Sequence, residues 1–191
     1  MEALKILRYR RSAPFMKHHH IVPTQVERVL ADNEFIISKT DPKGKITYGN
    51  REFKDYSGFS ESELLGIQHN IVRHPDMPRA VFKLLWDEVQ AGREVFAFVK
   101  NMSKDGSFYW VFANVTPSLD RQENVVGYFS VRRKPNRNAL PQVAGLYQKM
   151  LAAERLAGAR DAIGASTQIL VDALKSARMN YEEWVLKLQN T

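Results

Sequence analysis

Apolar and polar positions alternate with a period of two in two regions of the chain, and this pattern predicts strands. The first region is a pair of short runs, Phe35–Thr40 and Lys45–Tyr48, separated by an Asp-Pro-x-Gly turn. Proline sets φ and glycine accepts a positive φ in such turns, so the two runs predict a hairpin. The second region extends from Val95 to Arg132 and contains three longer runs, two of them joined by the Asp105–Gly106 turn. We therefore expect five strands.

Helical signals occupy the stretch between these two regions. Asn50–Tyr56 reads as a helix, and Ser60 with Glu63 three residues later is typical of a capping box. A longer helix follows Pro78, where apolar residues recur every three or four positions, and Val26–Leu30 reads as a further short helix. An α+β fold buries this pattern: a five-stranded antiparallel sheet with short helices on one face.

The segment after Pro135 contains no strand signal, so we divide the chain into an N-terminal arm (1–29), a domain (30–134) and a C-terminal helical extension (135–191). Apolar residues from Ile163 to Leu188 recur at alternating steps of four and three, which favours a seam between helices. Asn180 with Glu183 would instead start a separate helix. The seam predicts a homodimer in which tail helices and arms pack together.

Composition narrows the range of possible functions. The chain has no cysteine, which excludes disulfides, thiolate metal sites, iron–sulfur clusters and flavin–cysteinyl photochemistry. No apolar run approaches the roughly 20 residues needed to span a bilayer, so we expect no membrane span and a cytoplasmic location. No nucleophile-elbow, phosphate-loop or metal-ligand spacing is present, so we do not expect an enzyme.

The net charge of +7 comes mainly from the flanks of the predicted domain. Basic residues concentrate in Lys5–Lys17 and Arg132–Arg137, and we interpret both clusters as solvated. No helix-turn-helix or zinc-finger pattern accompanies them, so nucleic-acid binding is not expected. The three adjacent histidines His18–His20 are interpreted as an exposed loop rather than a closed metal site.

Two motifs identify the domain more closely. Asn50–Gly66 fits the pattern N-x-x-F-x-x-x-[ST]-G-[FY]-[ST]-x-x-E-L-x-G, and Lys104–Trp110 fits [KN]-x-G-x-x-[YF]-W. Together they resemble the signatures of PAS domains, and the resemblance covers residues 30–134. It implies the PAS fold.

The segment His69–Pro78 carries a narrower resemblance. It is similar to the HN-[ML]-VRHPDMP segment of bacterial aerotaxis receptors, whose PAS domain holds FAD, and Val99–Asn101 matches that family's VKN strand. The resemblance implies FAD as the cofactor. The positions that match family residues at or near the flavin are Arg73, His74, Asp76, Asn50, Asn101, Trp86 and Phe82.

The chemistry of these side chains agrees with that assignment but leaves alternatives. A guanidinium such as that of Arg73 suits phosphate oxygens, the amides of Asn50 and Asn101 suit a ring edge, and His74 is a titratable donor. Alternatively, the Arg73–Asp76 segment forms only a salt-linked cap before the next helix. Phe82 and Trp86 would then be ordinary core residues, and Asn50 a turn residue.

Two positions depart from the aerotaxis pattern. The family has W-x-G before the VKN strand, where this chain has Val95 and Ala97. Restoring that pattern with Val95→Trp and Ala97→Gly is expected to tighten flavin binding. The family's transmembrane anchor and methyl-accepting region are also missing.

These observations predict a cytosolic sensor that binds FAD and reports redox state or oxygen through its flanking helices, with a chemotaxis-type protein as its partner. The alternative is a PAS interaction module without a flavin. Such a module would dimerise or dock on a partner through its sheet and tail, with any pocket empty or holding another ligand.

Overall fold

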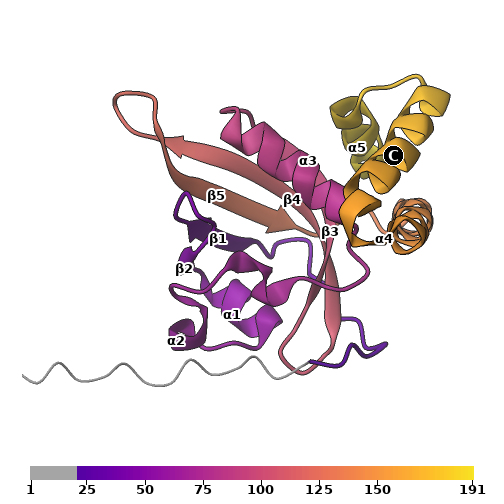
Figure 1. The fold of residues 1–191 in the computed structure, drawn as a ribbon. Coiled ribbons are helices and arrows are strands. Elements are labelled where there is room, and N and C mark those ends of the chain that lie inside the picture. Colours follow the sequence, from indigo (N-terminus) through magenta and orange to yellow (C-terminus); the bar gives the residue numbers. More distant parts are fainter. Residues whose placement is uncertain (1–20) are drawn as a thin grey trace, which may run out of the picture.

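The centre of the molecule is a five-stranded antiparallel sheet with the strand order β2-β1-β5-β4-β3 (Figure 1). It is seen in a computed structural model that describes residues 21–191. The strands are β1 (Ile36–Thr40), β2 (Ile46–Gly49), β3 (Val95–Met102), β4 (Phe108–Leu119) and β5 (Val125–Arg133). The predicted α+β class and the five strands are confirmed.

The short helices lie on one face of this sheet, as predicted. They are α1 (Arg51–Ser57), α2 (Glu61–Leu64), the 3-10 turn η1 (His69–Val72) and α3 (Arg79–Gln90). The capping box predicted for Ser60 with Glu63 is present. The Asn50 side chain caps α1 as well, since it accepts a hydrogen bond from Phe53 N at 3.0 Å. These local signals position the chain segment that runs from the sheet to α3.

The helix predicted over Val26–Leu30 was wrong. This segment is extended and pairs with the start of β4: Arg28 N donates to the carbonyl of Phe108, and Phe108 N donates to the carbonyl of Val26. The backbone partners lie about 80 residues away along the chain, so no local pattern predicted them. The turn before β4 leaves no space at Gly106, where a Cβ atom would lie 2.2 Å from the carbonyl oxygen of Val22.

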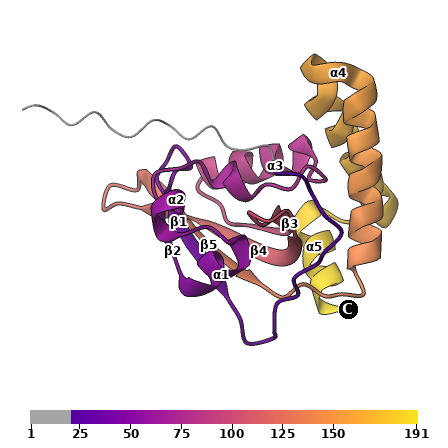
Figure 2. The ribbon, with the colours of Figure 1, turned by 90° about the horizontal axis from the view of Figure 1, so that it is seen from below.

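The C-terminal extension contains α4 (Leu140–Ala177) and α5 (Tyr181–Asn190), and α4 reverses direction at Gly158. Gly158 has φ +72°, outside the helical region. Twelve residues of a straight helix span about 18 Å, yet the Ser166 hydroxyl donates to Glu154 across 2.8 Å. The two halves of α4 therefore form a helical hairpin, which stands beside the sheet in Figure 2.

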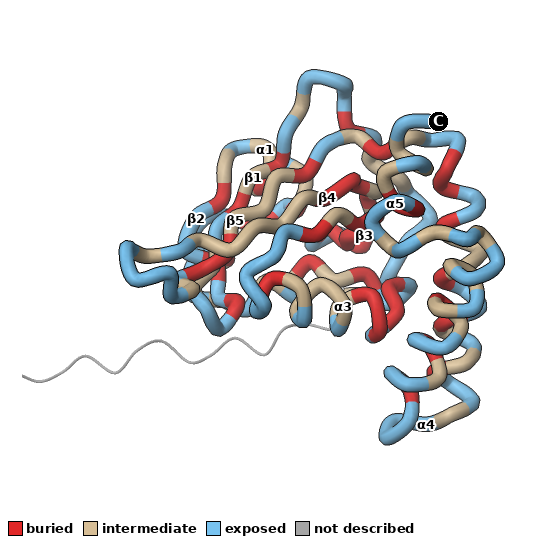
Figure 3. The backbone as a smooth tube through the Cα atoms, turned by 90° about the horizontal axis from the view of Figure 1, so that it is seen from above, coloured by how far each residue is buried: buried red, intermediate tan, exposed pale blue. Residues whose placement is uncertain are grey.

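The second face of β3 and β4 is covered by this extension. The Tyr147 hydroxyl donates to the carbonyl of Phe98 at 2.8 Å, and the Tyr147 ring stacks on Trp110. Trp184 and Val185 of α5 are buried in the same apolar cluster. Figure 3 shows that buried residues gather on the sheet and on the sides of the helices that face it.

The seam from Ile163 to Leu188 is not one helix. It is interrupted at Arg178, and α5 follows with Asn180 as its N-cap, as the alternative capping box predicted. The Asn180 Oδ1 accepts from Glu183 N at 2.8 Å. The seam residues pack mainly on their own chain, because Leu170 and Trp184 are buried there. The homodimer was predicted because the seam was expected to be exposed, and that reason no longer applies. The homodimer stays a prediction.

Two further expectations concern the N-terminal segment and the membrane. The basic cluster Lys5–Lys17 and the histidines His18–His20 lie outside the described residues. Among the helices of residues 21–191, none combines the length and the apolar composition that crossing a membrane requires.

Replacing Trp184 with alanine should reduce the free energy of unfolding by about 3–5 kcal/mol, since it leaves a cavity between α5 and β3. Leu156→Ala is the matched control, because Leu156 is 89% exposed and its truncation should change stability by less than about 0.5 kcal/mol. Urea unfolding followed by circular dichroism measures both variants. Equal stabilities would contradict the packing of α5 described above.

Candidate functional site

A cavity of about 260 Å³ lies between α3 and the inner face of the sheet. Its walls are largely apolar, from α3 on one side and from the central strands on the other. The apolar lining residues include Phe82, Leu85, Trp86, Val89, Val99, Ala113, Val115 and Tyr128. Apolar walls with a few polar groups are typical of small-molecule sites.

The aromatic wall is held in place by the first hairpin turn. Trp86 packs edge-on against Tyr128, with ring centroids 5.2 Å apart. Gly44 has φ +77°, and a Cβ atom there would lie 3.0 Å from the Trp86 ring. The Asp-Pro-x-Gly turn therefore supplies both the positive φ that glycine tolerates and the space that Trp86 occupies.

One end of the cavity is polar and carries a buried positive charge. Arg132 of β5 is only 2% exposed, and its Nη2 donates to the Ser38 hydroxyl. No carboxylate neutralises it within the described residues, and its Nε and Nη1 have no hydrogen-bond partner there. The Phe53 ring lies 4.8 Å from the guanidinium and gives partial compensation through a cation–π contact. Burial lowers the pKa of Arg132 to about 10, so it remains charged at neutral pH.

His69 completes this polar end. Its Nε2 lies 3.0 Å from the Ser38 hydroxyl oxygen, and its ring stacks on Phe53. Burial, and then the charge of Arg132, lower the pKa of His69 to about 3, so the ring is neutral at physiological pH. Since Ser38 accepts from Arg132, its own proton is available to Nε2, which places the His69 proton on Nδ1.

Arg73 lies at the opposite end, where the chain leaves η1. Its backbone forms an isolated antiparallel bridge with Asn101 of β3. Its guanidinium lies 4.5 Å from the Phe82 ring centroid and donates to the carbonyl of Met77 at 2.9 Å. Burial is the main cause that lowers the pKa of Arg73, and the nearby Glu154 carboxylate opposes it. Arg73, Phe82, Trp86 and Asn101, all predicted from the sequence, are thus brought together around one cavity.

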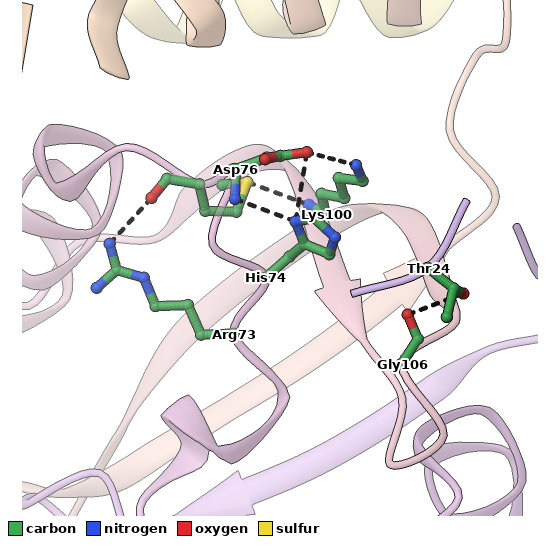
Figure 4. Close-up of polar contacts among 7 residues, drawn as sticks. Thr24, Arg73, His74, Asp76, Lys100 and Gly106 are labelled. Atoms are coloured by element: carbon green, nitrogen blue, oxygen red, sulfur yellow. Dashed lines mark hydrogen bonds and ion pairs between the residues drawn. The ribbon is translucent and has the colours of Figure 1, made fainter. Parts of the chain in front are cut away.

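His74 and Asp76 do not line the cavity. Figure 4 shows Arg73 extending away from a separate cluster of His74, Asp76 and Lys100. Asp76 forms a 2.7 Å ion pair with Lys100, and its backbone N–H donates to His74 Nδ1 at 3.0 Å. Burial and the charge of Lys100 lower the pKa of His74 to about 4. This cluster fastens the turn before α3 to β3.

Asn50 also lies away from the lining. Its Oδ1 accepts from Phe53 N and Ile37 N, and its Nδ2 donates to the carbonyl of Phe35 at 2.7 Å. The side chain therefore caps α1 and connects it to β1. This agrees with the alternative given in the sequence analysis, in which Asn50 is a turn residue.

Three residues of the site were missed by the sequence analysis: Ser38, His69 and Arg132. The interpretation of Arg132 as part of a solvated cluster was wrong, because the side chain is buried. The alternation along β5 carried the signal, since Arg132 has the same phase as Tyr128 and Ser130, which line the cavity. His69 stood inside the quoted His69–Pro78 motif.

The two departures from the aerotaxis pattern lie beside the cavity rather than in its wall. Val95 is 4% exposed and packs with Val89 and Tyr128, and Ala97 is opposite Ala113 on β4. A tryptophan at position 95 would overpack this cluster. The structure therefore gives no support to the expectation that Val95→Trp improves the site.

Comparisons with known proteins agree with this architecture. The family model described as "PAS fold" matches residues 24–134, and the chain belongs to this family. Among curated relatives, it is 38% identical over 133 residues to the aerotaxis receptor of Escherichia coli (strain K12), covering 70% of this chain and 26% of that protein. It is 28% identical over 97 residues to a nitrogen fixation regulatory protein of Klebsiella pneumoniae, covering 51% and 20%.

The chain therefore spans about a quarter or less of the length of these two relatives. A solved light-oxygen-voltage domain, from a study of a flavin analogue, superimposes with a TM-score of 0.51 at 23% identity, covering 60% of this chain and 86% of that one. This likeness supports the fold. The names of these two relatives describe a receptor and a regulatory protein.

The two buried histidines make stability depend on pH. In the unfolded chain their pKa is about 6.5, but in the folded protein it is about 3 for His69 and about 4 for His74. Between the folded and the unfolded pKa of each histidine, the unfolded state therefore binds more protons than the folded state. The stability that is present above pH 6.5 is lost as the pH falls. We expect a loss of about 1–2 kcal/mol per histidine between pH 7 and pH 5.

Urea unfolding at pH 7 and at pH 5 measures this loss. His69→Gln keeps a polar group beside Ser38 but removes the titration, so its stability should fall by about half as much as that of the unmodified protein. A wild-type stability that is equal at the two pH values would contradict the neutral, buried state of both rings.

Proposed function

We propose that this chain is a sensor domain that binds FAD in the cavity beneath α3 and reports redox state or oxygen through its C-terminal helices. The observation that carries the proposal is the buried cation Arg132, which lines an apolar cavity with aromatic walls and has two donors without an acceptor among the described residues. Burying such donors without acceptors is costly, so a ligand that offers acceptors would relieve the cost. The similarity to an aerotaxis receptor supports the same reading.

The lining residues fit the parts of a flavin. Its ring is flat and largely apolar, and Trp86 and Phe82 offer aromatic surfaces for such a group. The carbonyl oxygens of the ring edge are acceptors, and Arg132 and the Asn101 amide offer donors. Arg73, at the other end of the cavity, suits the phosphates of the cofactor.

The residues at the polar end also offer a route for a signal. A bound flavin supplies a redox change that alters the charge and the protonation of its ring. Arg132 would respond by changing its hydrogen bonds to Ser38 and, through Ser38, those of His69. Arg132 is next to the last residue of β5, and α4 begins at Leu140, so a shift there passes directly into the C-terminal helices.

The signalling role extends beyond the cavity. We propose a cytoplasmic sensor without enzymatic activity, whose partner is a chemotaxis-type signalling protein, in accord with the name of the relative from Escherichia coli. The homodimer predicted from the sequence remains part of this proposal. A PAS domain of this kind biases an equilibrium between two states rather than driving a large rearrangement.

The purified protein should be yellow and should release FAD on denaturation. Arg132→Leu should weaken FAD binding about 10- to 100-fold, because it removes a charge-assisted contact. Arg73→Ala should weaken it similarly at the phosphate end. Titration of the apoprotein with FAD, followed by the quenching of flavin fluorescence, measures each affinity.

Arg51→Ala is the matched control, since the Arg51 side chain is 86% exposed and lies outside the cavity. Its FAD affinity should equal that of the unmodified protein. An unchanged affinity in Arg132→Leu would remove this residue from the site. A colourless protein that binds no added FAD would instead favour the interaction module without a flavin.

A further inference from the structure

A second cavity adjoins the first one on the side of the C-terminal extension. It measures about 860 Å³ and lies between the segment of residues 70–79 and the hairpin of α4. Asn70 and Arg73 line both cavities, so the two cavities are neighbours that share these side chains. A ligand long enough to reach past Arg73 from the first cavity would therefore meet the lining of the second.

The second cavity has the charge of an anion site. Arg73, Arg79 and Arg155 line it, against a single carboxylate, Glu154. That carboxylate is already engaged, since it is 8% exposed and accepts from Arg79 N at 2.6 Å and from the Ser166 hydroxyl at 2.8 Å. The cavity therefore keeps an excess of positive charge for phosphate groups.

The remaining lining suits a flat aromatic base. Ile71, Met77, Met102 and Leu151 give apolar surface, and a guanidinium such as that of Arg155 can stack on a planar ring. Space is available because the α4 hairpin contributes Gly158 and two alanines at this point. A nucleoside joined to phosphates combines the two features that this lining recognises.

We propose that the second cavity holds the adenosine phosphate half of a dinucleotide whose ring lies in the first cavity, with Arg73 at the pyrophosphate between them. The inference rests on the proposed flavin function and deepens it, because it makes the C-terminal extension part of the binding site. Arg155 of α4 becomes a specificity residue for FAD over FMN, which lacks the adenosine half. The ligand then contacts α4 directly, in addition to the path through β5.

The test compares FAD with FMN, titrated into the apoprotein. The unmodified protein should bind FAD at least about tenfold more tightly than FMN. Arg155→Glu, which reverses an exposed charge at the second cavity, should lose this preference while its FMN affinity stays within about twofold. Ala159→Trp, which fills the cavity with a bulky side chain, should behave in the same way.

Arg160→Glu is the matched control, since Arg160 is exposed on the same helix and does not line the cavity. It should keep the full preference for FAD. Equal affinities for FAD and FMN in the unmodified protein, or a preference retained in both Arg155→Glu and Ala159→Trp, would overturn the inference while leaving flavin binding intact. Failure of both flavins to bind would instead overturn the proposed function on which the inference rests.

Discussion

The alternation of side chains along β3 and β4 is the constraint on which the rest of the structure depends. Neighbouring residues of a strand point to opposite faces, so Val99 lines the cavity while Phe98 beside it packs in the cluster that includes Tyr147 and α5. Both faces of these strands are buried, and the C-terminal helices therefore form part of the same core. A displacement of β3 or β4 moves the cavity wall and the helix contacts together.

Buried polar groups determine which elements of this core are connected to one another. Glu154 joins the first backbone N–H of α3 to the second half of α4, and Arg132 joins β5 to β1 through Ser38. The contacts of Glu154 with α3 and of Arg132 with Ser38 connect elements far apart in the sequence. Their desolvation is costly, and that cost is typical of positions where function rather than stability selects the residue. The two groups lie at the boundaries of the two cavities.

The fold could be predicted from the sequence wherever local chemistry determines it. The Asp-Pro-x-Gly turn, the capping boxes and the period-two runs all gave elements that the structure contains. The helix predicted over Val26–Leu30 was wrong because the backbone of this segment pairs with Phe108, and no local pattern specifies that partner. Four of the seven predicted site residues line the cavity. Arg132 was missed because Arg133 and Lys134 follow it and suggested a solvated cluster, although adjacent strand residues must face opposite sides.

The reversal of α4 at Gly158 determines which surface of the domain would move when the sheet changes. An uninterrupted helix of 38 residues would extend about 57 Å and would act as a lever whose far end moves most. The reversal returns the chain to the sheet, and α5 ends against β3 instead. A protein that reads the state of this domain would therefore have to recognise a local change of surface beside the sheet, not the swing of a distant arm.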